Sequence, residues 1–85
     1  MPEICRFLGI VITMYHREHE PPHFHARYAG HKITVRIADG AVGGHFPPRA
    51  LGHVMEWWSL HRPELAANWT LAEEGRELKA IEPLE

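Results

Sequence analysis

The sequence is poor in cysteine and has no long apolar run. Its single Cys5 excludes an internal disulfide and any multi-cysteine zinc finger, and a lone thiol suits a reducing compartment. The longest nearly apolar stretch, residues 7–15, is far shorter than the roughly 20 residues that cross a bilayer, so no membrane segment is expected. Glu3 and Arg6 precede this stretch and no small-residue cleavage site follows it, which is unlike a signal peptide. These absences predict a cytoplasmic protein.

The sequence also lacks a strong net charge. Its formal charge is −2 and its isoelectric point is near 6.4, which disfavours a nucleic-acid-binding protein. Basic residues outnumber acidic ones over residues 1–49, and the reverse holds over residues 50–85. Histidine is the residue in excess, with eight in the chain and most of them in the more basic part. The histidines are therefore the first place to look for function.

The 85 residues are 45% hydrophobic and 24% charged, the composition of one small globular domain. Residues 4–15 are rich in β-branched and aromatic side chains and predict one central strand, with a bulge at Gly9. Polar and apolar residues alternate over 23–28 and again over 32–37, which predicts a hairpin with one apolar and one polar face. Residues 41–46 form either a short further strand or a loop.

Two helices are expected in the second half of the chain. Pro47 and Pro48 mark the start of the first helix, because proline is tolerated in a first turn. This helix runs to about residue 61. Trp57 and Leu60 lie at the exposed edge of its apolar stripe, and a second helix follows from Pro63. The stripe that would face the sheet consists of Leu51, Val54, Met55 and Trp58.

The order of strands first and helices second predicts an α+β fold. We expect a small antiparallel sheet of about three to four strands packed against one or two C-terminal helices. The strands fall within about residues 4–46 and the helices within about residues 48–75, and residues 76–85 form a docked tail. All of these elements belong to a single domain, residues 1–85.

The candidate site is a group of histidines around the start of the predicted hairpin. His23 and His25 are two positions apart on a strand, so their side chains project from one face about 6.7 Å apart. His19, in the preceding loop, completes a set of three ligands for a divalent metal such as zinc, with a coordination position left open. Glu20 and His45 are the alternative third ligands. The competing interpretation is an ordinary solvated hairpin face.

The same face also fits catalysis without a metal. Histidine changes charge near neutral pH, so His23 and His25 can act as general base and general acid. Arg27 shares their face, and Arg36 or Lys32 lies across the hairpin, where each could hold a phosphodiester. His23, His25 and Arg27 are thus the candidate catalytic residues of a histidine-based ribonuclease. The metal-dependent and metal-free interpretations both stay open.

A partner surface is expected on the first helix. Partly exposed aromatic side chains often mark protein–protein contacts, and a small domain gains most from association. Trp57 and Leu60 therefore predict a homodimer or a complex with a small partner protein. Cys5 lies in an apolar stretch and is expected to be a buried structural thiol.

Several motifs resemble those of one bacterial family, domain-of-unknown-function family 4160. They are I-C-R-F-L-G-I-V-I-T-M-Y at the start, E-P-P-H-F-H-A, P-P-R-A-L, W-x-x-x-H-R-P-E-L-x-x-N-W, and L-K-x-I-E-P-L near the end. The resemblance covers essentially the whole chain, and its most specific element is P-P-H-x-H at residues 21–25. Members are small prokaryotic proteins often encoded beside another small domain, which implies a two-gene module similar to toxin–antitoxin pairs.

The resemblance and the residues together lead to one expectation with an alternative. We expect a binding component of such a module, with His23, His25 and Arg27 on its ligand surface and the product of a neighbouring gene as its partner. The alternative is an enzyme that uses the same face, either a metal-dependent hydrolase or a histidine-based ribonuclease.

Overall fold

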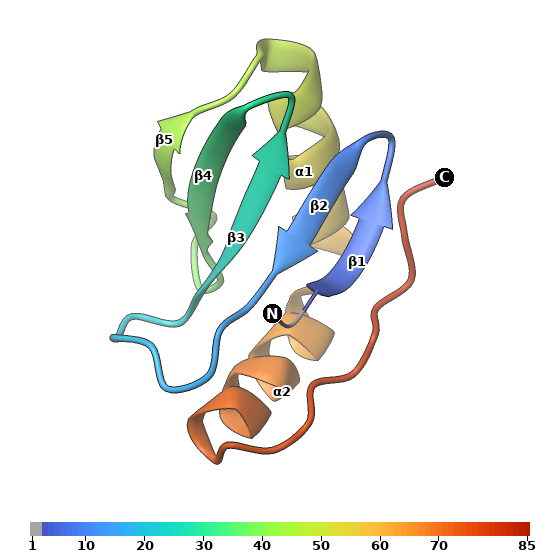
Figure 1. Cartoon of the computed structure of the whole chain (residues 1–85). Coiled ribbons are helices and arrows are strands. Elements are labelled where there is room, and N and C mark those ends of the chain that lie inside the picture. The colour runs from blue at the N-terminus through green and yellow to red at the C-terminus, as the bar shows by residue number, and fades with distance from the viewer. Residues whose placement is uncertain (1–2) are drawn as a thin grey trace.

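The computed structural model describes residues 3–85, which form a five-stranded antiparallel sheet and two helices. Neighbouring strands in the chain are neighbours in the sheet throughout, in the order β1-β2-β3-β4-β5. The elements are β1 (Glu3–Phe7), β2 (Ile10–Thr13), β3 (His23–Tyr28), β4 (His31–Arg36), β5 (Val42–His45), α1 (Pro48–Leu60) and α2 (Arg62–Glu73). α1 lies behind one face of the sheet, α2 runs below the lower ends of the strands, and no helix lies in front of the other face (Figure 1).

The α+β class with an antiparallel sheet and C-terminal helices is confirmed, but the sheet has five strands where three to four were predicted. The difference arises in residues 4–15, which form two strands and not one. Leu8 and Gly9 have φ values of 51° and 79°, and two positive φ values in a row make the tight turn that suits a two-residue hairpin. Phe7 consequently pairs with Ile10. The bulge predicted at Gly9 lies instead between Glu3 and Cys5.

The second hairpin matches the alternation of the sequence. Its turn is Ala29-Gly30, and Tyr28 pairs with His31. Residues 41–46 do contain a strand, because β5 pairs with β4 in spite of two glycines. Gly44 helps this pairing, since a Cβ there would lie 2.7 Å from the carbonyl oxygen of Lys32. A side chain at that position would push the two strands apart.

The helix α1 begins at Pro48, as expected, but the face that it buries is turned from the predicted one. Trp57, predicted to be at an exposed edge, is fully buried, whereas Trp58 is only partly buried. The Trp57 ring packs 5.7 Å from Phe7 and 5.6 Å from Phe24, measured between ring centroids. Its indole N–H donates to the carbonyl of Glu82 at 2.8 Å, so the tail covers the flank that was predicted to be open.

This correction removes the argument for a partner surface at Trp57. Leu60 is the large apolar side chain that remains exposed at this edge. A single exposed leucine is normal on a protein surface and does not indicate an interface. Self-association and a partner from a neighbouring gene stay predictions without support from this part of the fold.

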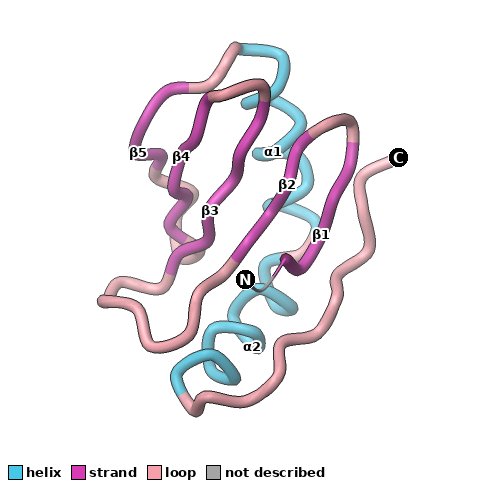
Figure 2. Tube along the Cα trace, in the orientation of Figure 1, coloured by secondary structure: helices cyan, strands magenta, loops and turns pink. Residues whose placement is uncertain are grey.

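The C-terminal residues run as an extended segment without helix or strand beside β1 (Figure 2). The backbone N–H of Ile81 donates to the carbonyl of Ile4 at 2.9 Å, so the tail covers one edge of the sheet. Asn68 on α2 holds it with two hydrogen bonds to the backbone of Lys79, at 2.8 and 2.9 Å. Cys5 is buried in the core, as predicted. No helix within residues 3–85 has the length and apolar character needed to cross a membrane.

Candidate metal centre

Three side chains from the loop before β3 and from β3 itself converge on one point. The Nε2 atom of His25 lies 2.9 Å from Glu18 Oε1, and the Nε2 atom of His23 lies 3.2 Å from the same oxygen. Each residue offers one ligand atom, and these atoms lie within 4.8 Å of one another. The two imidazole rings are 5.1 Å apart between centroids. Two nitrogens and one carboxylate oxygen are thus close enough to bind a single ion.

The backbone before β3 sets the orientation of the His23 ring. Its Nδ1 atom lies 2.8 Å from the carbonyl oxygen of Pro21. A carbonyl only accepts hydrogen bonds, so Nδ1 carries the hydrogen and Nε2 is the nitrogen left to bind a metal. An ionised carboxylate also only accepts, so without a metal the 2.9 Å contact between His25 and Glu18 is a hydrogen bond donated by His25 Nε2. Metal-binding histidines are commonly held in this way, with the nitrogen that does not bind the metal donating to a carbonyl or carboxylate.

Aromatic neighbours hold the two imidazoles from either side. The Tyr15 ring lies edge-on at 4.7 Å from the ring of His25, and the Trp69 ring lies 5.4 Å from that of His23. The side chains of His23, His25 and Glu18 retain 17%, 25% and 30% of their exposed surface. This partial burial restricts rotamers and excludes much of the water, yet one side stays open to a ligand.

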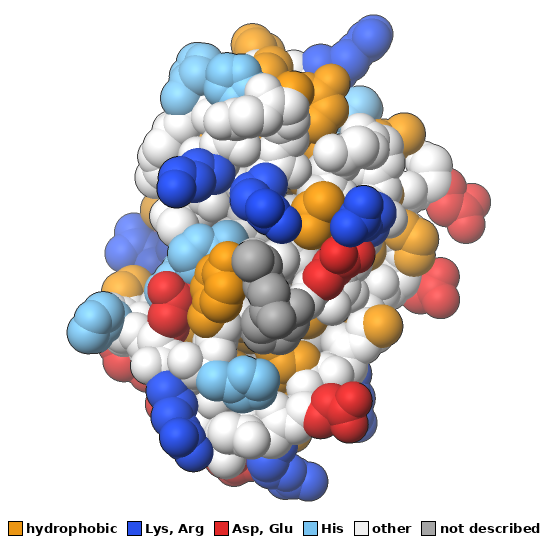
Figure 3. All heavy atoms as spheres, viewed as in Figure 1, with side chains coloured by type: hydrophobic (Ala, Val, Ile, Leu, Met, Phe, Trp, Pro, Cys, Tyr) orange, Lys and Arg blue, Asp and Glu red, His pale blue; other side chains and the backbone are white. Residues whose placement is uncertain are grey.

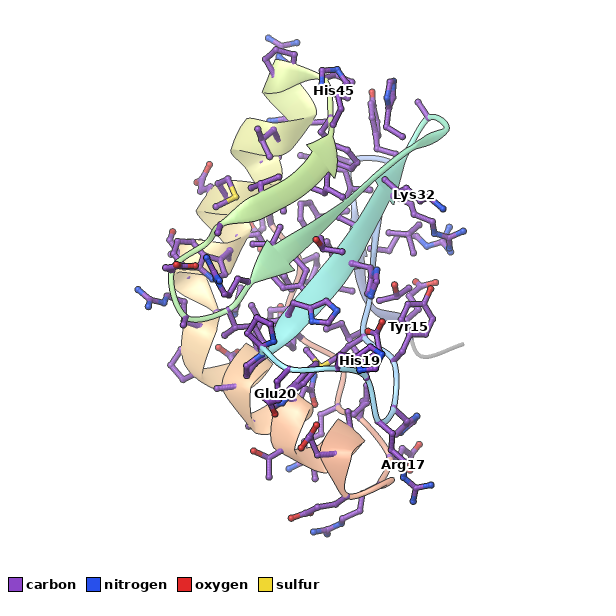
Figure 4. All side chains as sticks on the ribbon, turned by 90° about the vertical axis from the view of Figure 1, so that its left-hand side faces the viewer. Tyr15, Arg17, His19, Glu20, Lys32 and His45 are labelled. Carbon is purple, nitrogen blue, oxygen red and sulfur yellow. The ribbon has the colours of Figure 1, made fainter. Side chains whose placement is uncertain are left out.

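The structure brings His23 and His25 together, as the strand pattern indicated, but the third group within reach is Glu18 and not His19. His19 is exposed and is not among the residues whose ligand atoms converge. Glu20 is exposed as well. His45 lies at the end of the sheet remote from this loop (Figure 4), where its ring contacts His31 at 5.8 Å. The sequence indicates Glu18 as a candidate ligand in one way only: it lies in the same charged loop as His19.

Arg27, the third predicted catalytic residue, is exposed on the same uncovered face of the sheet. It lies directly opposite Lys32 of β4, and the row continues to Val11 and Arg6 on one side and to His45 on the other. Lys and Arg side chains (blue) form a band across this face, and histidine (pale blue) and carboxylate (red) side chains lie beside it (Figure 3). Positive charge thus borders the His/Glu cluster.

Arg36 lies opposite His23 across the hairpin, but its charge is already paired. Its Nε atom lies 2.9 Å from the Asp39 carboxylate. This guanidinium, together with the backbone N–H of Ala41, holds the pKa of Asp39 below its usual value. Arg36 therefore contributes less free positive charge to the face than its position alone suggests.

A shallow groove leads from the two histidines over β4 and β5. One part of it, about 340 Å³, borders His23 and Arg36, and another, about 320 Å³, borders His25 and Lys32. Thr34 and Gly43 border both parts, which lie on either side of this cross-strand pair. A Cβ at Gly43 would lie 3.0 Å from the Thr34 hydroxyl oxygen, so a glycine keeps this floor open.

A family model matches residues 9–70 of the chain, and its description is Domain of unknown function (DUF4160). The match contains the whole His/Glu cluster and the P-P-H-x-H motif. It confirms the resemblance seen in the sequence motifs. No curated protein and no solved structure matches the chain.

Proposed function

The chain belongs to the DUF4160 family, whose description assigns no activity, and we propose that it is a metal-dependent hydrolase with its metal bound by Glu18, His23 and His25. The observation that carries the proposal is the convergence of two imidazole nitrogens on one carboxylate oxygen, at 2.9 and 3.2 Å. Two histidines and one glutamate are a ligand set of catalytic zinc sites, in which the fourth position takes water or substrate. The same donors with open positions also suit ferrous iron.

The geometry favours a metal over a metal-free acid–base pair. A general base and a general acid must each reach a different atom of the substrate. Here the Nε2 atoms of both histidines face the same carboxylate oxygen, and Nδ1 of His23 is taken by Pro21. An ion between the three groups would be bound by both Nε2 atoms and by the carboxylate oxygen at once, in place of the hydrogen bond from His25 Nε2 to Glu18. Neither imidazole presents Nε2 to the groove as a free acid or base.

A metal held in this way supplies one chemical step, the activation of water. Its charge lowers the pKa of a bound water to about 7, so that hydroxide is available near neutral pH. Water activated by such a metal would attack the substrate: its oxygen would form the new bond, the bond to the leaving group would break, and the leaving group would take the proton. Glu18, His23 and His25 hold the ion, while the groove over β4 and β5 receives the substrate. Partner binding within a two-gene module remains a separate prediction.

Calorimetric titration of the protein, purified without a nickel column, with zinc, manganese and ferrous iron tests the metal site. We expect one ion per chain. His25→Gln and Glu18→Gln should each lower the metal affinity by more than about 100-fold, because mutation of residues that only support a ligand already lowers affinity by about 10- to 100-fold. Affinity should also fall in acid, because protonated imidazoles cannot bind a metal.

Matched controls separate this site from the general histidine content of the chain. His19→Gln and His45→Gln remove exposed imidazoles that lie outside the cluster and should leave the affinity unchanged. If His19→Gln weakens binding as much as His25→Gln does, the third ligand is His19 and the assignment of Glu18 is wrong. If none of the three metals binds at millimolar concentration, the proposed function is rejected.

A further inference from the structure

The geometry points to a phosphate ester as the substrate class, with its phosphate held between the metal centre and the cation pair Arg27–Lys32. This inference rests on the proposed function, because the metal is one of the two groups that would hold the phosphate. The cation pair is an independent observation, which rests on strand register and charge.

Arg27 and Lys32 are direct cross-strand partners on the uncovered face of the sheet. Within residues 3–85, neither side chain makes an ion pair, whereas Arg6 pairs with Glu3 at 2.9 Å in the same row. Arg6, and to a smaller extent Arg27, lower the pKa of the Glu3 carboxyl. Like charges directly opposite each other destabilise a sheet. Within the pair itself the two charges repel, and a bound anion would turn this repulsion into attraction.

The cation pair and the metal centre occupy adjacent rows of the sheet. Arg27 follows His25 by two residues on β3, a rise of about 6.7 Å on the same face. Lys32 precedes Thr34 by two residues on β4, and Thr34 lies opposite His25. The long side chains of Arg27 and Lys32 can therefore reach oxygens of a group bound beside His25.

The groove provides room for this group where the two rows meet. Its part of about 320 Å³ is lined by both His25 and Lys32. The Gly43 position, opposite Thr34, has no side chain to fill it. The Thr34 hydroxyl lies on the floor and adds a neutral hydrogen-bond donor. The candidate ligand His25, the Thr34 hydroxyl and Lys32 thus border one open space. Arg27 lines a neighbouring hollow, which it shares with Lys32.

The charge of this arrangement suits phosphate better than a neutral substrate. A divalent ion with one carboxylate ligand keeps a net positive charge, and Arg27 and Lys32 add two more. Metal ions combined with Arg and Lys side chains are the groups that stabilise a transferring phosphoryl group, whose charge is spread over several oxygens. A peptide or carboxyl ester develops a single oxyanion and needs fewer cations.

The acidic isoelectric point does not contradict this inference. Acidic residues outnumber basic ones over residues 50–85, which form the helices and the tail. α1 lies behind the opposite face of the sheet, and α2 lies below the ends of the strands (Figure 1). The local charge of the uncovered face, and not the net charge of the chain, governs the binding of an anion there.

The hydrolytic step follows directly for this substrate class. With a metal held by Glu18, His23 and His25, the oxygen of an activated water would form a new bond to phosphorus, the ester P–O bond would break, and the alcohol would leave with the proton of the water. One water is consumed and no other reactant is needed. Phosphate monoesters and the diesters of a polynucleotide share this chemistry, so the experiment includes both.

The test measures binding of inorganic phosphate by the zinc-loaded protein, together with hydrolysis of three p-nitrophenyl substrates: the phosphate monoester, the phosphate diester and the acetate. The double variant Arg27→Gln/Lys32→Gln should lose at least roughly tenfold in phosphate affinity, since each charge-assisted contact is worth about a factor of ten. Gly43→Ala should also weaken phosphate binding, by filling the groove without changing charge. Arg49→Gln, which removes an exposed cation on α1, is the matched control and should change nothing.

The outcomes separate this inference from the proposed function. Zinc affinity should be the same in the double variant as in the unaltered protein, because neither cation is a ligand. If zinc binds but phosphate does not, or if the double variant binds phosphate as tightly as Arg49→Gln, the substrate class is wrong and the metal site stands. Hydrolysis of the acetate without either phosphate ester also overturns it. Turnover of the monoester or of the diester supports the inference and identifies which kind of phosphate ester the groove accepts.

Discussion

A Trp57→Phe substitution keeps an aromatic ring in the core but removes the indole nitrogen that ties α1 to the C-terminal tail. Trp57 is fully buried between Phe7 and Phe24, and its N–H donates to the carbonyl of Glu82. The same substitution at Trp58 removes a comparable hydrogen bond, to the carbonyl of Ile37 at 3.0 Å. Trp58 is only partly buried, so water can replace part of what is lost there.

The magnitudes follow from these contacts. Loss of one hydrogen bond costs about 1 kcal/mol of unfolding free energy, and the space left by a smaller buried ring costs about 1 kcal/mol more. Trp57→Phe should therefore destabilise by about 2 kcal/mol and Trp58→Phe by about 1 kcal/mol. In a domain of this size, 1 kcal/mol shifts the melting temperature by about 4–8 °C, so the two variants should differ measurably.

Urea unfolding followed by far-UV circular dichroism measures both variants without relying on tryptophan fluorescence. The midpoint should fall further for Trp57→Phe, with an unchanged slope, because a change in stability alone moves only the midpoint. A larger loss for Trp58→Phe would mean that α1 buries the face predicted from its apolar stripe. The account of the tail as a cover for Trp57 would then be wrong.

Two further predictions concern the tail and the thiol. Asn68→Ala should destabilise by about 1–3 kcal/mol, because the backbone N–H and carbonyl of Lys79 both lose their hydrogen-bond partner. Hydrogen exchange of the Ile81 N–H should also accelerate. Unchanged exchange would show that other contacts hold the tail. Burial raises the pKa of the Cys5 thiol, so the folded thiol stays protonated and should react with a maleimide much more slowly than in urea. Because the folded-state pKa is raised, stability should decline at alkaline pH, where the unfolded chain ionises first.

The parts of the fold that depend on local periodicity could be predicted from the sequence. Alternation over residues 23–28 placed His23 and His25 on one face, because successive side chains of a strand point in opposite directions. The structure puts their rings 5.1 Å apart. Pro48 at the start of α1 was equally predictable, since a proline in the first turn sacrifices no intrahelical hydrogen bond.

The parts that depend on tertiary contacts could not be predicted in this way. The turn at Leu8-Gly9 is hidden in an apolar run, because the inner side chains of β1 and β2 are all buried and leave no polar break. The buried face of α1 was misjudged because the predicted stripe was centred between Leu51 and Trp58, whereas Trp57, at its edge, packs against Phe7 and Phe24 of the sheet. Trp57 has a second cover, the tail, which comes from residues 25 positions further along the chain.

The third ligand of the candidate site has the same dependence on tertiary structure. Glu18 and His19 are adjacent in a loop, and spacing alone does not decide which of them faces the histidines. The loop is held by the far end of α2: the His16 ring donates to the carbonyl of Arg76 at 2.8 Å, and the backbone N–H of Arg17 donates to the carbonyl of Ala72 at 3.3 Å. Helix and sheet thus position the loop jointly, and that position turns the Glu18 carboxylate towards β3. The strand positions two of the three candidate ligands by its own geometry, and the contacts of the loop with α2 and the residues after it position the third.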